Sequence, residues 1–382
     1  LMKKKILVFT GSRADFGILL PLINKIKEDK SLNLILIAGP HHYQNATGKT
    51  YKEIKNNNLK IKEFQRYNFN KINEESILKY CGKSIIFFSE IINKHSPDLV
   101  ILLGDRYEVF VFAISSFFLN IPIAHIHGGE VTEAAFDEGL RHSITKMSNV
   151  HFVCHDIYKK RVIQLGENPK NVFNFGSLAV EQIKNKKYLN KQSLFKKFGL
   201  PTNKKLILVT FHPETRSKIS YKKQILILMN SLRGMKNISI VFTCNNLDTY
   251  GDFFISQIEK FCKKNNHSKI IRSMGINEYH NFAIHSDLVL GNSSSGIIEA
   301  PIMKSPTLNI GDRQKGRVFS KSIFQTNMNS SNIKKKIKYI FKNRKNIKYE
   351  KNFYKKNTSE NMLKQIKIFL KNKSTNKSFY DL

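Results

Sequence analysis

The feature that most constrains the fold is a regular alternation of predicted strands and helices along 382 residues. Short apolar runs bounded by turn residues indicate strands, and segments with apolar positions at helical spacing lie between them. Continuous apolar runs are typical of strands that are covered on both faces, as in parallel sheets. The alternation therefore predicts an α/β protein with parallel sheets and right-handed crossovers.

The alternation falls into two series, separated by a polar, lysine-rich stretch at residues 184–205 that has room for one short helix. The first series has predicted strands at 6–10, 34–38, 99–103, 121–126, 151–154 and 172–175, and predicted helices at 16–28, 75–94, 107–118 and 137–148. The second has predicted strands at 206–211, 238–243, 288–290 and 307–310, and predicted helices at 222–232, 253–264 and 296–302. Since a chain of this length exceeds a single core, we expect two α/β halves that face a cleft, followed by a helix at 359–369.

Composition argues against a nucleic-acid-binding protein. Lys and Arg total 64 against 29 acids, which gives a formal charge of +35. The lysines are dispersed among Asn and Ile, as at 56–62 and 334–348, and this pattern is typical of solvated faces. No basic stripe interleaved with aromatic residues and no helix-turn-helix spacing appears. The excess charge should instead attract an anionic substrate.

Cysteine usage and hydropathy predict a cytoplasmic protein with no membrane partner. The cysteines form no CxxC pair and show no zinc spacing, so we expect reduced thiols. The apolar stretch after Lys5 is too short for a signal peptide, and no later segment reaches transmembrane length. The four cysteines are Cys81, Cys154, Cys244 and Cys262.

Acids and histidines gather where two predicted strands end. The segments 104–108 and 125–130 each follow an apolar run, at 99–103 and 121–124. Ligands bind beyond the carboxyl ends of parallel strands, so Asp105 and Glu130 should line one cleft beside two adjacent central strands. A helix cap explains Asp105 taken alone. Two desolvated carboxylates facing each other would be costly for stability alone, so the set indicates function.

The predicted helix at 137–148 carries two pairs of charged residues. Asp137 and Arg141, like Glu138 and His142, are four residues apart, so the members of each pair share a helix face. A surface ion pair would explain one of them. Two pairs directly after Glu130 favour a helix that faces the cleft. The acids lack a clustered ligand geometry and form no Asp-x-Asp motif, so no metal is expected.

The segment Asn292–Gly296 follows a predicted strand and opens a helix. Its successive backbone N–H groups and its serine hydroxyls can bind an anion such as a diphosphate, although serines also cap helices. Glu299 can accept two hydroxyls of a ribose, or can simply interact with the helix dipole. The residues of this anion site are Ser293, Ser294, Ser295 and Gly296.

Three further loops carry candidate ligand contacts. Arg13, in the loop 11–15, is either a second clamp on phosphates or a surface arginine. His212 ends the first strand of the second series, where it can donate a proton or bind a phosphate, unless it is structural. Arg313 and Arg317 lie in a glycine-bounded loop after the strand at 307–310, a position that often contacts ligands.

Seven motifs occur in order between residues 5 and 318, and together they are far more specific than any one of them. They read GSRADFG, GDRYE, HIHGGEVTE, DEGLRHSITKMS, FHPET, GNSSSGIIEAP and NIGDRQKGRV. This set closely resembles the hydrolysing UDP-N-acetylglucosamine 2-epimerases of the bacterial sialic-acid type.

The resemblance implies two Rossmann-like domains in the GT-B arrangement, at 1–180 and 181–358, with a C-terminal helical segment at 359–382 that crosses back to the first domain. It implies conversion of UDP-N-acetylglucosamine (UDP-GlcNAc) and water to N-acetylmannosamine and UDP, through 2-acetamidoglucal, for sialic acid biosynthesis. No cofactor is implied, and a homodimer or homotetramer is expected.

The resemblance also assigns roles to residues. Catalytic roles fall on Asp105, Glu130, Asp137, Glu138 and His212. Substrate contacts fall on Arg13, His42, Arg141, His142, Ser293, Ser294, Ser295, Gly296, Glu299 and Arg313. One departure concerns His42, because relatives carry Thr-Gly two residues before a substrate-side histidine, whereas this chain has Gly39-Pro40 before His41 and His42. That loop is therefore expected to differ.

Two alternatives stay open. Close relatives act on UDP-N,N'-diacetylbacillosamine, and one sequence does not fix the group at C4 of the sugar. A GT-B glycosyltransferase would keep the serine segment and Glu299 but would not need the acids Asp105, Glu130 and Asp137. Release of N-acetylmannosamine without an acceptor separates the epimerase from the transferase.

Overall fold

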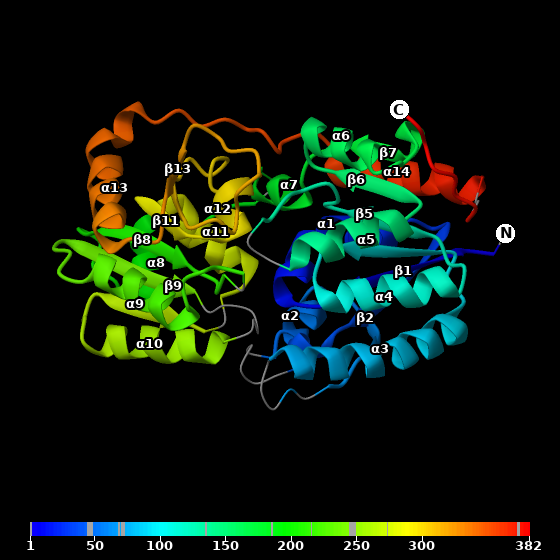
Figure 1. Cartoon of the computed structure of the whole chain (residues 1–382), viewed down its shortest axis with the longest axis horizontal. Coiled ribbons are helices and arrows are strands. Elements are labelled where there is room, and N and C mark those ends of the chain that lie inside the picture. The colour runs from blue at the N-terminus through cyan, green and yellow to red at the C-terminus, as the bar shows by residue number, and fades with distance from the viewer. Residues whose placement is uncertain are drawn as a thin grey trace. The chain divides into compact units, whose positions relative to one another are not determined.

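The computed structural model describes residues 2–43, 49–67, 69, 73–133, 136–184, 186–214, 216–243, 250–272, 274–372 and 375–382. The chain divides into two compact units (Figure 1). Unit 1 contains Leu1–Glu130, Phe136–Gln182 and Phe353–Leu382, and unit 2 contains Val131–Ala135 and Ile183–Asn352. Two residues of the sequence analysis, Thr215 and Cys244, lie outside the described residues.

Unit 1 is built on a parallel sheet of seven strands in the order β3-β2-β1-β4-β5-β6-β7. Its strands are β1 (Lys4–Thr10), β2 (Leu32–Ala38), β3 (Ile61–Phe64), β4 (Leu99–Leu103), β5 (Ile123–Ile126), β6 (Val150–Val153) and β7 (Val172–Asn174). Its helices are α1 (Arg13–Glu28), α2 (Tyr51–Asn56), α3 (Glu74–His95), α4 (Tyr107–Phe118), α5 (Asp137–Met147), α6 (Asp156–Gln164) and α14 (Thr358–Lys371), with 3-10 turns at Pro40–His42 and Pro169–Asn171. Helix α7 (Leu178–Lys184) lies at the boundary of the two units.

The apolar runs behave as predicted. Strand β4 is buried at all five positions and pairs with β5 in parallel, so the two runs are adjacent strands near the middle of the sheet. Strand β5 begins two residues later than predicted, at Ile123. The reason is Pro122, which has no N–H to donate to a neighbouring strand.

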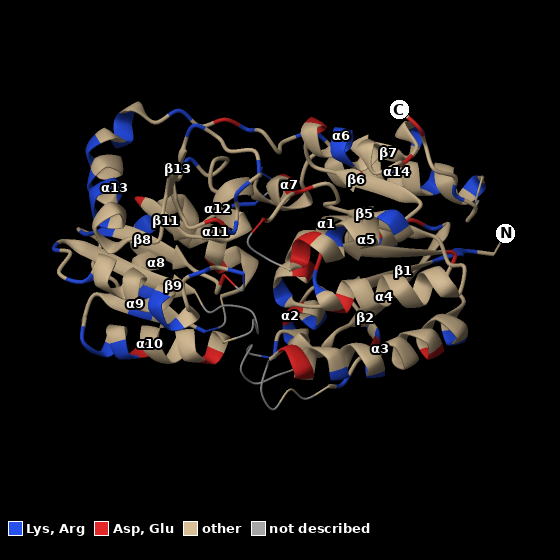
Figure 2. Cartoon of the chain, viewed as in Figure 1, with Lys and Arg blue, Asp and Glu red and all other residues tan. Residues whose placement is uncertain are grey.

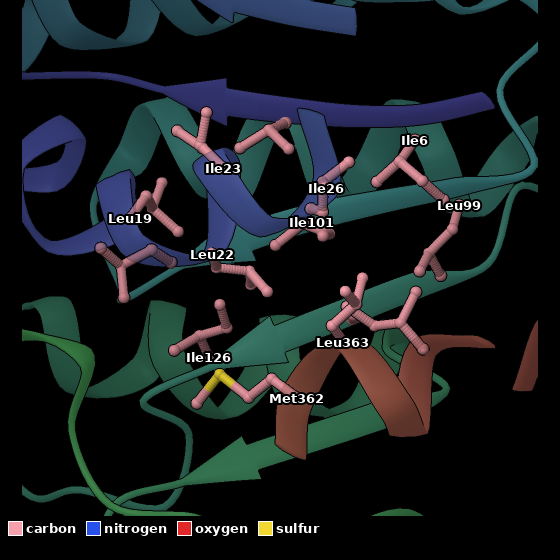
Figure 3. Close-up of a cluster of buried hydrophobic side chains, with 14 of the residues drawn as sticks. Ile6, Leu19, Leu22, Ile23, Ile26, Leu99, Ile101, Ile126, Met362 and Leu363 are labelled. Carbon is pink, nitrogen blue, oxygen red and sulfur yellow. The ribbon is translucent and has the colours of Figure 1, made fainter. Parts of the chain in front are cut away.

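The core of unit 1 explains the position of the C-terminal helix. Helices α1 and α14 pack together beside the sheet (Figure 3). Burial of these side chains removes a large apolar area from water, which is the main stabilising contribution to such a core. Labelled members are Ile6, Leu19, Leu22, Ile23, Ile26, Leu99, Ile101, Ile126, Met362 and Leu363.

The last residues of the chain are tied to α5 through Lys377. Its Nζ donates to the carbonyl oxygens of Lys146 and Ser148, each at 2.6 Å, and forms an ion pair with Glu167 Oε2 at 2.6 Å. The backbone N–H of Tyr380 donates to Gly166 O at 3.0 Å. A cation at the C-terminal end of a helix interacts favourably with the helix dipole. The tail therefore stabilises the end of α5 opposite to the end that carries the candidate acids.

We expect Lys377→Met to lower the thermal midpoint of the protein. Hydrogen bonds to charged groups contribute about 1.5–3 kcal/mol, so a loss of about 2 kcal/mol corresponds to a fall in Tm of about 4–8 °C for a unit of this size. Differential scanning calorimetry measures the change, and Lys371→Met, at the exposed end of α14, is the matched control. Equal midpoints for the two variants would contradict the anchoring role.

Unit 2 repeats the architecture with a parallel sheet of six strands in the order β10-β9-β8-β11-β12-β13. Its strands are β8 (Lys205–Thr210), β9 (Ile238–Thr243), β10 (Ser268–Ile271), β11 (Leu288–Gly291), β12 (Thr307–Ile310) and β13 (Ile323–Thr326). Its helices are α8 (Lys191–Lys197), α9 (Tyr221–Leu232), α10 (Gly251–Lys263), α11 (Ile276–His285), α12 (Ser294–Ile298) and α13 (Ser330–Asn343), followed by a 3-10 turn at Arg344–Asn346.

Several helices of unit 2 differ from the sequence expectation, among them α12 and α13. Helix α12 begins at Ser294 and ends at Ile298, earlier than the predicted 296–302, because Pro301 disfavours helical geometry in the residue before it. Helix α13 was not predicted at all. Its buried Ile333, Ile337 and Ile340 recur at helical spacing, but the lysines between them give the segment the appearance of a polar loop.

The positive charge is spread over both units. Figure 2 shows Lys and Arg on many helices and loops, not gathered on one element, as the sequence indicates. Within the described part of the chain, no helix combines the length and the apolar character needed to cross a bilayer.

Candidate active site

The strand order of each unit fixes where a ligand can bind. In unit 1 the order of strands reverses between β1 and β4, and in unit 2 it reverses between β8 and β11. At such a switch point the two loops leave the sheet in opposite directions and open a crevice at the carboxyl end of the strands. In unit 1, Asp105 lies in the loop after β4, and Arg13 directly follows the loop after β1. In unit 2, His212 and Ser293 lie in the loops after β8 and β11.

The guanidinium of Arg141 organises the acids of unit 1. It lies 1% exposed on α5, where its Nη2 donates to Asp105 Oδ2. Its Nη1 donates to Glu138 Oε2 at 2.8 Å and to the backbone oxygen of Glu130 at 2.9 Å. Burial opposes its charge, but the acids Asp105, Glu130 and Glu138 outweigh burial and raise the pKa of Arg141 above its usual value. The loops after β4 and β5 are thereby held around one cation.

The first two turns of α5 carry the remaining residues of this group. Glu138 Oε1 lies 3.1 Å from His142 Nε2, so the predicted pair four residues apart forms. Asp137 is the first residue of the helix and is partly exposed, as are Glu138 and His142. Their exposure leaves room for a ligand to reach these side chains, whereas Arg141 acts from inside the unit.

His125, on β5, connects the loop after β4 to helix α5. Its Nε2 lies 2.8 Å from Gly104 O, next to Asp105, and must donate there because a carbonyl only accepts. Its Nδ1 then accepts from the hydroxyl of Thr145, at 3.1 Å, on α5. Burial lowers the pKa of His125 to about 3, so the ring is neutral at physiological pH. A neutral ring keeps this hydrogen-bonding pattern fixed.

The loop that carries Glu130 has an unusual backbone. His127 has a φ of +68° and Gly129 a φ of +75°, a region that residues other than glycine rarely occupy. A Cβ atom at position 129 would also overlap the backbone oxygen of Tyr158, so glycine is required there. The tight loop brings Glu130 Oε1 to 3.0 Å from His127 Nδ1 and 3.4 Å from Cys154 Sγ, and only 2% of Glu130 is exposed.

A second buried ionic cluster, which the sequence analysis did not predict, lies beside Asp105. Glu108 is fully buried, its Oε1 contacts His41 Nε2, and Arg106 Nη2 lies 3.2 Å from the same oxygen. Although burial acts to raise it, the pKa of Glu108 is held at about 2 by Arg106 and His41. Glu108 is the last residue of the motif GDRYE, and only the position of this acid in the first turn of a buried helix could have indicated the cluster.

Asp15 completes this cluster and gives a pH-dependent prediction. Burial raises its pKa from 3.8 to about 6, with Arg106 acting in the opposite direction. An unfolded Asp15 loses its proton near pH 3.8, and the folded one near pH 6. Between these values the folded state binds more protons than the unfolded state, so the free energy of unfolding falls as the pH rises, by up to about 3 kcal/mol.

An asparagine side chain cannot ionise, so Asp15→Asn should gain stability relative to the wild type as the pH rises from about 4.5 to about 7. Chemical denaturation of both proteins across this pH range measures the difference. Asp252→Asn, on the first turn of α10 in unit 2, is the control. A constant difference between Asp15→Asn and the wild type would contradict the raised pKa.

Arg13 and His42, the two predicted substrate contacts near the start of the chain, differ in exposure. Arg13 is the first residue of α1, partly exposed, beside Ser12, whose Oγ accepts from Asp15 N and caps the helix. His42 is fully buried, with Nε2 3.0 Å from Thr10 Oγ1 and Nδ1 2.9 Å from Thr50 Oγ1. Burial lowers the pKa of His42 to about 3. These contacts favour a structural role for His42, which ties β1 to the segment before α2.

In unit 2, Asn292 joins the loops at the switch point. Its Oδ1 accepts from His212 N at 2.7 Å, and its Nδ2 donates to His212 O at 2.9 Å. Strands β8 and β11 approach so closely here that a Cβ atom on Gly291, whose φ is +138°, would overlap the backbone oxygen of Thr210. The His212 loop and the serine segment are therefore fixed to each other.

The serines and Glu299 each contact a residue of helix α11. Ser293 Oγ caps α12 and lies 3.0 Å from Ser295 Oγ, which in turn lies 2.6 Å from the hydroxyl of Tyr279. Ser294 and Gly296 are the first and third residues of α12. Glu299 follows that helix, and its Oε2 lies 2.7 Å from His280 Nε2. Tyr279 and His280 were not predicted, because their helix α11 was not recognised from the sequence.

Arg313 lies beside the serine segment. Its Nη1 donates to Asn292 O at 3.1 Å, and Gln314 Nε2 donates to the same oxygen at 2.8 Å. Its backbone N–H donates to Glu214 Oε1 at 2.9 Å, which binds the loop after β12 to the loop after β8. Burial raises the pKa of Glu214. The structure thus brings His212, the serines and Arg313 together around Asn292, a residue without a predicted role.

The polar groups of the two units suit different kinds of chemistry. Unit 1 supplies carboxylates held at fixed positions by Arg141, which suits proton transfer. Unit 2 supplies hydroxyls, an arginine and a carboxylate at a switch point, which suits a nucleoside diphosphate.

Three of the unit 1 groups, His127, Glu130 and Cys154, also have ligand atoms within 4.8 Å of one another. The described cysteines Cys81, Cys154 and Cys262 are in no disulfide.

Two Rossmann-like units, each with its polar groups at the switch point, define the GT-B fold class. Comparison of folds agrees with this class. The S. aureus MnaA-UDP co-structure superposes with a TM-score of 0.82 at 19% identity, over 100% of both chains. The predicted fold class is confirmed.

The chain belongs to the UDP-N-acetylglucosamine 2-epimerase family, whose profile matches residues 24–367. It is similar to the Campylobacter jejuni GDP/UDP-N,N'-diacetylbacillosamine 2-epimerase (hydrolyzing), at 40% identity over 330 residues that cover 86% of this chain and 85% of that protein. It is also similar to the Escherichia coli polysialic acid biosynthesis protein P7, at 39% identity over 385 residues that cover 99% of this chain and 98% of that protein. The family predicted from the seven motifs is confirmed.

Proposed function

We propose that the protein is a hydrolysing UDP-GlcNAc 2-epimerase, which converts UDP-GlcNAc and water to N-acetylmannosamine and UDP. The observation that carries the proposal is the arrangement around Arg141, which holds Asp105, Glu138 and the backbone of Glu130 together in a member of this family. A transferase that only moves a sugar to an acceptor has no need for such a set of acids. The product would supply sialic acid biosynthesis.

The reaction needs two acid–base groups. The hydrogen at C2 of the sugar is only weakly acidic, so its removal requires a positioned base while UDP leaves from C1. Both bonds break to give 2-acetamidoglucal. Water then adds at C1, and a proton is returned to C2 from the opposite face, which inverts that carbon. Asp105, Glu130 and Asp137 are the proposed proton-transfer groups, with Glu138 holding Arg141 and His142 in place.

The leaving group is an anion, and unit 2 is suited to stabilise it. We assign the diphosphate to the serines of α12 and to Arg313, with Arg13 as a further cation. We assign the ribose to Glu299, whose carboxylate is oriented by His280. His212, fixed by Asn292, is the proposed proton donor or phosphate contact. Charge stabilisation that increases as the C1–O bond breaks is an effective form of catalysis.

A second candidate substrate is favoured by one observation. The relative with 40% identity is named for N,N'-diacetylbacillosamine, which carries an acetamido group at C4 in place of a hydroxyl. The relative named for polysialic acid biosynthesis matches a larger share of the chain, 99% against 86%, and supports UDP-GlcNAc. The expectations of a cytoplasmic protein and of a homodimer or homotetramer stay predictions.

Incubation with each nucleotide sugar separately, without an acceptor, tests the proposal. We expect UDP and free N-acetylmannosamine from UDP-GlcNAc, identified by mass spectrometry and NMR. A higher kcat/KM for the diacetylbacillosamine substrate would reassign the substrate but keep the reaction. Product formation only in the presence of an acceptor sugar would contradict the epimerase and support a glycosyltransferase.

A further inference from the structure

We propose that His127, Glu130 and Cys154 form a binding site for a zinc-like divalent cation, and that occupation of this site inhibits the enzyme. The inhibition rests on the proposed function of Glu130, whereas the binding does not. All three residues are in unit 1, in the loop after β5 and directly after β6. They are buried, at 8%, 2% and 1% exposure respectively.

The ligand atoms lie near the spacing that a tetrahedral ion requires. Glu130 Oε1 lies 3.0 Å from His127 Nδ1 and 3.4 Å from Cys154 Sγ, and all the ligand atoms lie within 4.8 Å of one another. Zinc binds sulfur at about 2.3 Å and nitrogen or oxygen at about 2.0–2.2 Å, so ligands of one tetrahedral zinc ion are roughly 3.3–3.6 Å apart. Small shifts of the side chains would bring the three ligand atoms to these distances from one another.

The chemistry of the donor set selects the ion. A thiolate, an imidazole and a carboxylate suit Zn²⁺ or Cd²⁺, whereas Mg²⁺ prefers oxygen ligands and keeps several waters. Binding requires loss of the thiol proton of Cys154, which is released to solvent as the Sγ–metal bond forms. The imidazole binds as the neutral form through Nδ1. Three protein ligands leave a fourth position for water, as in zinc sites that are not purely structural.

The surroundings hold the histidine in the required orientation. The hydroxyl of Ser177 lies 3.4 Å from His127 Nε2, the ring nitrogen that faces away from Glu130. Such a partner on the second nitrogen fixes the tautomer and orientation of a ligating histidine. The φ of +68° at His127 places its ring back toward Glu130 three residues later. The first feature is a contact between side chains and the second is a backbone conformation, and both belong to the fold of unit 1 itself.

Two cations limit the affinity of the site. Arg141 and Arg161 donate to the backbone oxygens of Glu130 and Gly129, at 2.9 Å and 3.3 Å. Their positive charge opposes a second cation nearby. We therefore expect reversible binding, weaker than in closed sites with four protein ligands, and complete removal of the ion by a chelator.

Inhibition follows from the bond to Glu130. A carboxylate bound to zinc is a much weaker base than a carboxylate alone, so Glu130 could no longer exchange a proton with the sugar. The sequence alone predicts no metal, because the acids of the chain are not clustered as ligands. The present site uses one acid only, and its other two ligands are a histidine three residues before Glu130 and a cysteine 24 residues after it.

Metal binding can be measured without reference to activity. Tag-free full-length protein, stripped with a chelator, is titrated with Co²⁺ as a spectroscopic probe and with Zn²⁺ in competition. We expect one equivalent of reversibly bound ion and a thiolate-to-cobalt charge-transfer band. Cys154→Ser should abolish that band and weaken Zn²⁺ binding by more than the roughly 10–100-fold that loss of an outer partner costs. Cys262→Ser, in unit 2, is the matched control and should bind like the wild type.

His127→Asn provides a second variant, because Asn tolerates positive φ better than most residues, and it too should lose the cobalt band. In activity assays, Zn²⁺ should inhibit the wild type reversibly, Mg²⁺ should not, and Cys154→Ser should resist Zn²⁺. Absence of the charge-transfer band in the wild type, or its survival in Cys154→Ser, would overturn the site. Stoichiometric binding that depends on Cys154 but leaves the rate unchanged would uphold the site and contradict the role of Glu130.

Discussion

Replacement of Asp105 by Asn should lower kcat by about 10²–10⁴-fold, the usual contribution of a positioned acid–base group. The amide keeps the shape of the carboxylate but cannot take up a proton. UDP affinity should stay within a few-fold of the wild type, since the groups assigned to UDP lie in other loops. Rapid-quench kinetics and calorimetry with UDP measure both quantities. Because Asp105 also contacts the buried Arg141, the thermal midpoint of the variant must be measured alongside.

Glu130→Gln and Asp137→Asn should lose activity to a similar extent but should fail differently. A variant without the first base should form no intermediate. A variant that cannot complete the addition of water should release 2-acetamidoglucal, which NMR detects. Glu90→Gln, an exposed acid on α3, is the control and should retain full activity. Near-normal kcat in all three site variants would exclude these carboxylates from proton transfer.

The second large effect concerns the ribose. We expect Glu299→Ala to weaken UDP binding about 10- to 100-fold, because hydrogen bonds to a charged acceptor contribute about 1.5–3 kcal/mol. His280 occupies one side of this carboxylate, which leaves its other lone pairs for the two ribose hydroxyls. Isothermal titration with UDP measures the change. Glu278→Ala, which removes an acid on α11 that pairs with Lys197, should bind UDP normally.

Unchanged UDP affinity in Glu299→Ala would show that this acid serves only to orient His280. In that case the loss should appear in the thermal midpoint instead, because His280 is fully buried and would lose its partner. The two readouts therefore distinguish a ligand contact from a structural pair.

The sequence predicted the strand framework well, because buried parallel strands leave a clear signal. Strands β4 and β9 and helix α4 have the predicted bounds, since apolar runs and flanking glycines or polar residues mark both ends. Loops that directly follow such strands could be placed at the ligand-binding edge by topology alone. For this reason Asp105 and Ser293 could be predicted to lie at that edge, directly after β4 and β11, where the structure places them.

Other parts depended on contacts that a sequence does not reveal. Arg141 was recognised as a helix-face residue, but its burial and its contact with Asp105 arise from the packing of α5 on two loops. His42 was expected to contact the substrate, yet each of its ring nitrogens lies within hydrogen-bond distance of a threonine hydroxyl. The lysines of α13 concealed three buried isoleucines, because composition averages over both faces of a helix.

The most direct test of the proposed mechanism is a single turnover of UDP-GlcNAc in pure D₂O, with the product analysed by NMR. Since different groups remove and return the proton at C2, the returned one must come from solvent. We predict equal amounts of UDP and N-acetylmannosamine, with deuterium at C2 of every product molecule. N-acetylmannosamine that retains protium at C2 would contradict elimination and addition, because one shielded group or a hydride would then carry the hydrogen across the ring.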